Sequence, residues 1–218
     1  MEMAIESDLI VSAEDFGNPF SELEGINSRF LAIGGGKGGT GKTTVTANIA
    51  LIMAEMGKKV IIVDVDLGAA NMHTCLGIKY PPVALTDFLY GPKESLDDIL
   101  IDTLHPNLKL ISGAKDILQL ANIPFTVKTK LLNHLKKLNA DMILLDLGSG
   151  SAYNVIDFFR FTRESLLIIS PEPTSIENVS TFLKKSVYRE LTRSAELKDS
   201  KEIQNLVNRL IDPEDKEL

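Results

Sequence analysis

A glycine-rich loop with two lysines is the part of this chain best suited to chemistry. The segment GGGKGGTGKTT contains the spacing Gly-x-x-x-x-Gly-Lys-Thr, running from Gly36 to Thr43. Glycines let consecutive backbone N–H groups point inward at phosphate oxygens, and a helix that starts near Lys42 directs its positive dipole end at the same anion. The Lys42 ammonium adds a full charge near the β- and γ-phosphates, and the Thr43 hydroxyl is placed to bind Mg²⁺. The loop therefore predicts a nucleoside triphosphate site.

Aspartates that end two apolar segments supply the acidic groups such a site needs. Asp64 and Asp66 close VIIVDVD, and Asp146 closes MILLD. Two residues apart on a strand, Asp64 and Asp66 point to the same side. We expect Asp66 to orient or polarise the attacking water, and Asp64, Asp146 and Thr43 to hold Mg²⁺ and its water shell. Solvated acids at strand ends are the alternative interpretation. The predicted nucleotide contacts are Gly36, Lys37, Gly38, Gly39, Thr40, Gly41, Lys42, Thr43, Thr44 and Gly148.

Apolar strands alternate with helical segments along the chain, and this pattern predicts how these groups are positioned. The sequence predicts an α/β fold with a predominantly parallel β-sheet and helices on both faces. Ligands of such sheets bind beyond the carboxyl ends of the strands, where the glycine-rich loop and the aspartates fall. The expected strands are 30–34, 60–66, 108–112, 142–146 and 166–170, and the expected helices are 42–56, 86–90, 95–100, 127–138, 153–161 and 175–192.

Three segments are expected along the chain. Residues 1–28 are an acidic extension, predicted to be flexible, with a partner-docking segment around Phe16 and Phe20 as the alternative. Residues 29–193 form the nucleotide-binding domain. Residues 194–218 form a C-terminal helical segment with one apolar face, which fits packing on the domain or a partner better than a membrane, because acidic residues follow it.

Composition limits the function classes further. The 218 residues carry a formal net charge of −7, with no run of Lys and Arg and only 6% aromatic residues, so nothing indicates nucleic-acid binding. The acidic N-terminus is unlike a signal peptide, and a cytoplasmic location is expected. The single cysteine, Cys75, excludes an internal disulfide and an all-cysteine metal cluster within one chain. We expect Cys75 to be a half-buried small hydrophobe.

The second lysine, Lys37 in KGGTGKT, resembles the deviant Walker A motif of the MinD/ParA family of P-loop ATPases. The segments DVDLGAAN, DLGSG and PEPTS are similar to those of its flagellar-number group, FlhG or FleN, and the resemblance covers about residues 30–193. It implies ATP and Mg²⁺ as ligands, slow hydrolysis, and a homodimer in which Lys37 reaches the partner subunit's nucleotide. It also implies a protein partner that recognises the ATP state, in the positioning or counting of flagella or a division site. Peripheral association with the inner face of the cell membrane stays open.

Two other functions are compatible with the same motifs. A phosphoryl-transferring or amide-ligating enzyme would need a substrate pocket beside the γ-phosphate, and a nucleotide-binding adaptor would show little turnover. Relatives continue past the PEPTS helix into a strand with an asparagine that reads the adenine, and no such strand is evident after Thr192. We therefore expect a shortened chain, with the choice between adenine and guanine open.

Overall fold

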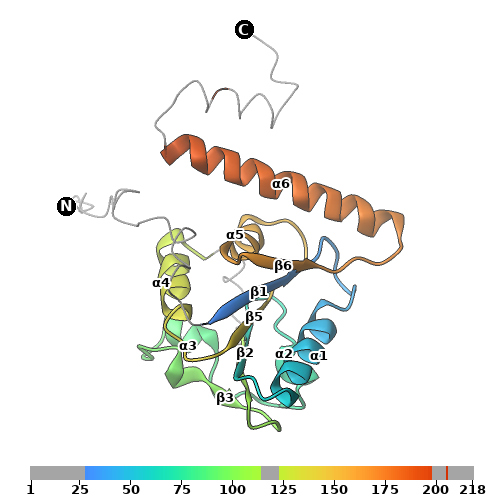
Figure 1. Cartoon of the computed structure of the whole chain (residues 1–218). Coiled ribbons are helices and arrows are strands. Elements are labelled where there is room, and N and C mark those ends of the chain that lie inside the picture. Colours follow the sequence, from blue (N-terminus) through green and yellow to red (C-terminus); the bar gives the residue numbers. More distant parts are fainter. Residues whose placement is uncertain (1–27, 114–122, 198–204, 206–218) are drawn as a thin grey trace, which may run out of the picture.

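Six strands form one sheet in the order β3-β4-β2-β5-β1-β6 (Figure 1). The computed structural model describes residues 28–113, 123–197 and 205. All strand pairs are parallel except β3 with β4, which confirms the predicted predominantly parallel sheet. The strands are β1 Arg29–Gly34, β2 Val60–Asp64, β3 Ile101–Asp102, β4 Leu108–Ile111, β5 Met142–Asp146 and β6 Glu164–Leu167.

Helices cover both faces of the sheet because successive strand residues point to opposite sides. On β2, Ile61 and Val63 join the core under α3, α4 and α5, whereas Val60 and Ile62 join the core under α1 and α2. Residues on both faces of β2 and β5 are buried, as expected of central parallel strands. The helices are α1 Lys42–Glu55, α2 Met72–Cys75, α3 Leu85–Leu89, α4 Phe125–Leu135, α5 Tyr153–Phe161 and α6 Pro173–Leu197, with a 3₁₀ turn η1 Asp97–Ile99.

Helix α6 is the longest element and lies over α5 and the β6 side of the sheet (Figure 1). Phe182 is its fully buried anchor, and its ring meets that of Phe159 edge-on with the centroids 4.9 Å apart. Asp157 on α5 is buried and accepts hydrogen bonds from Lys128 on α4 and from Arg189 on α6. A buried charge network therefore joins α4, α5 and α6. No helix in the described residues is apolar over enough length to cross a bilayer.

The structure corrects several sequence predictions. Strand β2 ends at Asp64, so Asp66 lies in the following loop and not on the strand. The sequence pattern also missed α2 and the two-residue strand β3, which are too short to show a hydrophobic period. Cys75 is exposed instead of half-buried. Ser28, placed in the extension, is buried and donates hydrogen bonds to the carbonyls of Leu138 and Ala140. Residues 1–27 and nearly all of 198–218 lie outside the described part, so both terminal predictions stay predictions.

Candidate functional site

The glycine-rich loop connects the carboxyl end of β1 to the start of α1, as the sequence predicts. Gly39 and Gly41 have φ angles of 77° and 89°, a left-handed backbone that other residues rarely adopt. Gly41 is the N-cap of α1 and has no side chain to satisfy the first N–H groups of the helix. These N–H groups and the helix dipole make the curve of the loop suitable for an anion such as phosphate.

Lys42 lies inside this curve with only 7% of its surface exposed. Its Nζ donates a hydrogen bond to the Lys37 carbonyl oxygen at 3.2 Å, which folds the side chain back along the loop. Burial lowers the pKa of Lys42, although Asp146 and Asp66 act in the opposite direction. The two carboxylates do not offset the effect of burial on the Lys42 ammonium, so a bound anion would stabilise its charge. Lys42 therefore fits a phosphate-binding role.

Asp146 closes β5 next to the start of α1 and is 2% exposed. Its Oδ1 accepts a hydrogen bond from the Thr46 hydroxyl at 2.9 Å. Burial raises the pKa of Asp146, and hydrogen bonds from Thr43 and Thr46 act against that rise. The structure thus brings together Thr43 and Asp146, two of the predicted Mg²⁺ ligands. The motif did not predict the contact of Thr46 with Asp146. Because Thr46 lies one helical turn after Thr43, the two side chains are on the same face of α1, and the spacing could have indicated this contact.

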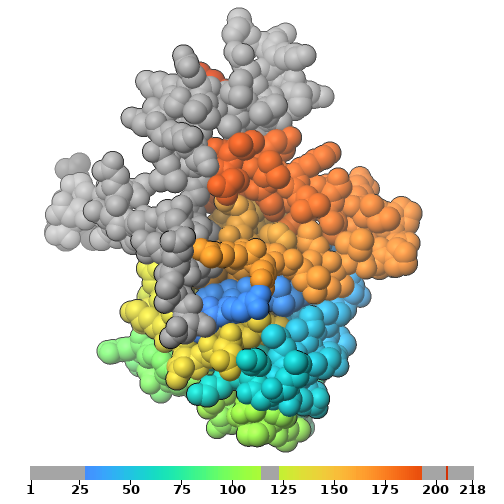
Figure 2. Space-filling model, in the orientation of Figure 1, coloured from blue at the N-terminus to red at the C-terminus, as the bar shows by residue number. Residues whose placement is uncertain are grey.

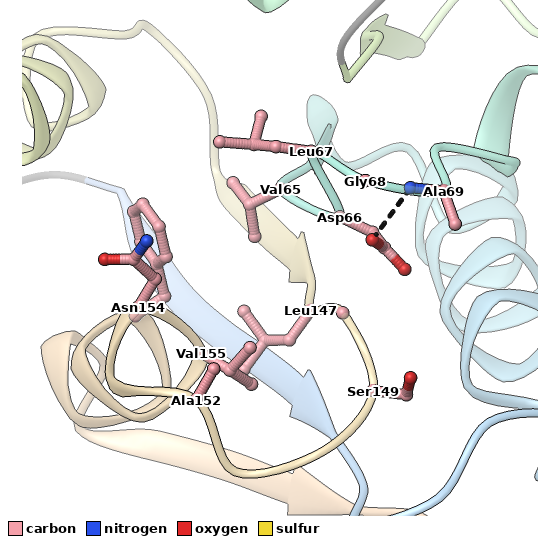
Figure 3. A pocket seen from close by; sticks show the side chains of 12 residues that line it. Val65, Asp66, Leu67, Gly68, Ala69, Leu147, Ser149, Ala152, Asn154 and Val155 are labelled. Atoms are coloured by element: carbon pink, nitrogen blue, oxygen red, sulfur yellow. Dashed lines mark hydrogen bonds between the residues drawn. The ribbon is translucent and has the colours of Figure 1, made fainter. Parts of the chain in front are cut away.

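Asp64 and Asp66 have different environments, although the sequence treats them as a pair. Asp64 is fully buried, and its two oxygens accept hydrogen bonds at 3.1 Å from the backbone N–H groups of Asp66 and Met72. Burial raises its pKa to about 7. Asp64 therefore fixes the loop between β2 and α2. Asp66 is half-buried, and its Oδ1 accepts a hydrogen bond from the Ala69 N–H at 3.1 Å (Figure 3).

Gly148 brings the loop after β5 against the Asp66 carboxyl. A Cβ placed on Gly148 would lie 3.3 Å from the Asp66 carboxyl carbon, so a larger residue here would press on this group. Gly150 adopts φ 87° and donates its N–H to the Gly35 carbonyl at 3.2 Å, which ties the same loop to the phosphate loop. The loops that carry the predicted catalytic and phosphate-binding residues are thus in direct contact.

Lys37 points away from the curve of the loop and contacts the start of α6. Its Nζ forms an ion pair with Glu172 and lies 3.2 Å from the Thr174 hydroxyl oxygen. Gly36 packs so closely on α6 that a Cβ there would lie 2.5 Å from the carbonyl carbon of Asn178. The sequence singled out the PEPTS segment but did not predict this contact. It follows from the parallel pairing of β6 with β1, which places both carboxyl ends at one edge.

A cavity of about 290 Å³ lies beside Asp66, between the loop after β2 and the loop that leads into α5 (Figure 3). Its wall is mostly apolar, and polar groups come only from Asp66, Ser149, Asn154 and the backbone. The residues that line it are Val65, Asp66, Leu67, Gly68, Ala69, Leu147, Gly148, Ser149, Ala152, Asn154, Val155 and Phe158.

The remaining predicted loop residues occupy the outer part of the curve. The Thr40 hydroxyl donates to the Lys37 carbonyl at 3.4 Å, Gly38 is exposed, and the exposed Thr44 lies in the first turn of α1. All the predicted site residues therefore gather at the carboxyl edge of the sheet, around β1, β2 and β5. The arrangement provides N–H donors and Lys42 for a polyphosphate, and the oxygens of Thr43 and Asp146 for a divalent cation. The half-buried Asp66 carboxyl, which accepts one backbone hydrogen bond, is available to a water molecule.

Family models, curated relatives and solved structures all match this chain, and the three comparisons indicate the same family. A family model described as an AAA domain matches residues 28–198. The antiactivator FleN of Pseudomonas aeruginosa is 32% identical over 157 residues, which are 71% of this chain and 55% of FleN. The chain spans about half the length of the curated relatives it matches.

Solved structures agree with this result. The septum site-determining protein MinD of Pyrococcus horikoshii, solved with Mg-ADP, is 31% identical with a TM-score of 0.58, covering 73% of this chain and 66% of MinD. A chain of the MinC:MinD cell division protein complex of Aquifex aeolicus is 27% identical with a TM-score of 0.62, and the match covers 78% of this chain and 65% of that one. The match over residues 28–198, the parallel sheet and the two-lysine loop together show that this chain belongs to the MinD/ParA family of P-loop ATPases, close to FleN.

Proposed function

We propose that this chain is a nucleotide-dependent switch that binds ATP with Mg²⁺, hydrolyses it slowly, and changes its association with a partner protein. The observation that carries the proposal is the presence of two lysines with separate positions on one phosphate loop. Lys42 lies inside the curve of the loop, and Lys37 extends outward to α6. The Mg-ADP bound by P. horikoshii MinD supports this choice of ligand.

The roles of the site residues follow from their surroundings. Residues 36–44 hold the phosphates through backbone N–H groups, and Lys42 neutralises their charge. Thr43 and Asp146, which already share a hydrogen bond, hold the cation, while the buried Asp64 supports them from behind. When bound, Mg²⁺ supplies charge neutralisation at the phosphate oxygens. Asp66 orients the attacking water, because it is the carboxylate of the cluster with solvent access, and Gly148 leaves room for the phosphate beside it.

Dimerisation gives Lys37 a second position. In the single chain, Lys37 is held by Glu172 and Thr174 of its own α6 region. In the proposed ATP-bound dimer, Lys37 leaves these groups and reaches the nucleotide of the partner subunit, where a cation stabilises charge on the transferred phosphoryl group. Hydrolysis removes that attraction, and the subunits separate. The change of Lys37 contacts is therefore the event that distinguishes the two states.

The output of the switch is the positioning or counting of a cell structure, and flagella are favoured over the division site by the similarity to FleN. A protein partner that binds only the ATP dimer reads the state, as the existence of a MinC:MinD complex supports. The switch acts in the cytoplasm. Residues 29–193 form its nucleotide domain.

Sedimentation velocity with ATP and with ADP tests the proposal. The wild-type chain should sediment as a dimer with ATP and as a monomer with ADP. Lys37→Ala should bind ATP normally but stay monomeric, Asp66→Ala should remain a dimer because it does not hydrolyse ATP, and Lys42→Ala should lose ATP binding. Lys109→Ala is the matched lysine control and should behave as wild type. Lys109 lies on β4, which β2 and β5 separate from β1 and its phosphate loop. An ATP-bound wild-type chain that stays monomeric would refute the dimer mechanism.

The cavity beside Asp66 favours a second candidate, an amide-ligating enzyme that activates a carboxylic acid. However, no Lys, Arg or His is among the lining residues, so a carboxylate substrate would be bound without a cation. Phosphate release that requires added succinate and ammonia would support this enzyme instead of the switch. Wild-type phosphate release no faster than the rate without protein would support an adaptor without turnover, and equal release by the wild-type, Lys42→Ala and Asp66→Ala chains would remove both residues from the mechanism.

A further inference from the structure

Thr46 lies on the inner face of α1, between this helix and the sheet. Thr46, Ala50 and Ala54 are spaced four residues apart and are 0, 0 and 1% exposed, so this row of α1 packs on the strands. Ile52 on the outer face is 56% exposed, and Figure 2 shows α1 in light blue at the molecular surface. The Thr46 hydroxyl is therefore closed off from solvent.

Asp146 reaches the same place from β5. Met142 and Leu144 lie on one face of this strand and belong to the apolar core under α1 and α2. Because strand residues alternate between the two faces, Asp146 is the next residue on that face. Its carboxyl group thus ends an apolar row and is buried. A carboxylate in such a position needs hydrogen-bond donors from the protein, since little water reaches it.

Helix α1 supplies these donors. Thr43 and Thr46, three residues apart on one side of the helix, both hydrogen-bond Asp146. The Thr46 Oγ1 lies 2.9 Å from Asp146 Oδ1 and 2.9 Å from the carbonyl oxygen of Lys42. The hydroxyl has a single proton for these two acceptors. In an α-helix a carbonyl also accepts the backbone N–H four residues later, so the Lys42 carbonyl depends less on this hydroxyl than Asp146 does.

The contact with the Lys42 carbonyl fixes the direction of the Thr46 hydroxyl. A threonine in a helix has few side-chain rotamers, and the 2.9 Å distance identifies the one in which Oγ1 turns back along the helix. Asp146 therefore meets a donor whose position is set by helix backbone. Thr43 is partly exposed, whereas Thr46 has no exposed surface for a cation. An effect of Thr46 on a cation site must then act through Asp146.

We propose that Thr46 is a positioning residue that holds the Asp146 carboxyl in place for Mg²⁺. The inference rests on the proposed function, in which Thr43 and Asp146 hold the cation. Removing a group that hydrogen-bonds a metal ligand without touching the metal typically weakens metal binding or activity by about 10–100-fold. Thr46→Val replaces the hydroxyl by a methyl group, which fills the same space but donates no hydrogen bond.

Binding of a fluorescent, non-hydrolysable ATP analogue, first in EDTA and then over a series of Mg²⁺ concentrations, tests this role without turnover. Wild type and Thr46→Val should bind the analogue equally in EDTA, because the phosphate loop is intact. Thr46→Val should need about 10–100 times more Mg²⁺ to reach half of the Mg²⁺-dependent tightening. Thr46→Ser, which keeps the hydroxyl, should titrate close to wild type. In ATP hydrolysis, an excess of Mg²⁺ should restore the wild-type kcat to Thr46→Val.

Thr129→Val is the matched control. Thr129 is also a buried helical threonine, and its Oγ1 donates to the Phe125 carbonyl four residues earlier at 3.0 Å, but no carboxylate in the described part of the chain accepts a hydrogen bond from it. Thr129→Val should therefore titrate with Mg²⁺ as wild type does.

Three results overturn the proposal. Thr46→Val could show the wild-type Mg²⁺ requirement, or it could lose analogue binding already in EDTA, which would indicate a distorted phosphate loop. Thr46→Ser could lose as much as Thr46→Val, which would assign the effect to packing of the side chain and not to its hydroxyl. A wild-type chain whose ATP binding does not respond to Mg²⁺ would instead refute the proposed function, and this inference with it.

Discussion

Gly36→Ala is expected to separate the phosphate loop from α6, because the structure leaves no space for a side chain there. A Cβ at this position would lie 2.5 Å from the carbonyl carbon of Asn178 and 2.7 Å from its carbonyl oxygen. The obstacle is helix backbone and not the end of a flexible side chain. An ordinary contact of 3.4 Å therefore requires α6 to move by about 1 Å. Gly38→Ala is the matched control, because the nearest atom to its Cβ would be the Ser149 Oγ at 3.7 Å.

The two substitutions should change the free energy of unfolding in opposite directions. Neither glycine has a positive φ, so alanine strains neither backbone. Alanine restricts the unfolded chain in both, which stabilises by about 0.4–1 kcal/mol. For Gly36→Ala this gain is opposed by overpacking, which costs about 1–3 kcal/mol and reaches higher values where backbone must move. We therefore expect Gly36→Ala to be about 1–3 kcal/mol less stable than Gly38→Ala.

Urea denaturation of the nucleotide-free chains, followed by circular dichroism, measures this difference directly. For a protein of this size it corresponds to a melting temperature about 2–12 °C lower for Gly36→Ala. Hydrogen exchange should become faster in the first turns of α6 in this variant, while the strands remain unchanged. Equal stability of Gly36→Ala and Gly38→Ala would show that the loop does not pack on α6 as described, and the basis for the Lys37 contact with Glu172 would fall with it.

Three further substitutions test other parts of the structure. Lys128→Met should destabilise the chain by about 3 kcal/mol in urea denaturation, because it removes a buried partner of Asp157; a change below 0.5 kcal/mol would contradict this. Without nucleotide and magnesium, stability should fall by about 2–3 kcal/mol from pH 5 to 7.5, since folded Asp64, with a pKa of about 7, keeps a proton that the unfolded chain releases; Asp64→Asn should remove this decrease. Phe182→Ala should cost about 3–5 kcal/mol in thermal melting, against little for the exposed Lys185→Ala.

The elements with a clear period were predictable from sequence. Helix α5 and strand β5 have the expected bounds, 153–161 and 142–146. An apolar face at helical spacing indicates a helix, and a short, fully apolar run indicates a buried strand, so both elements can be assigned from the pattern alone. The phosphate loop was predictable for a different reason, since its residue types are dictated by φ angles and by charge. Residues selected by local chemistry are therefore the ones that a sequence pattern can identify.

Contacts that depend on tertiary structure could not be predicted in the same way. The pair of Lys37 with Glu172 joins residues 135 positions apart, and it exists only because β6 lies next to β1 in the sheet. The different environments of Asp64 and Asp66 have the same origin. Strand β2 ends between them, so that one carboxyl is enclosed by backbone donors and the other faces the loop after β5. A two-residue spacing contains no information on where the strand stops.

Helix α6 is where these tertiary contacts meet. Its start holds Lys37 through Thr174 and packs Asn178 on Gly36, so a displacement of the phosphate loop must move the helix or break these contacts. Its middle is fixed to the domain by Phe182 and by the Arg189 contact with Asp157. Burial would raise the pKa of Asp157, but hydrogen bonds from Arg189 and Lys128 hold it below its usual value, so this anchor keeps its charge at neutral pH. A displacement that starts at Lys37 and Gly36 is therefore opposed, within the same helix, by the contacts of Phe182 and Arg189.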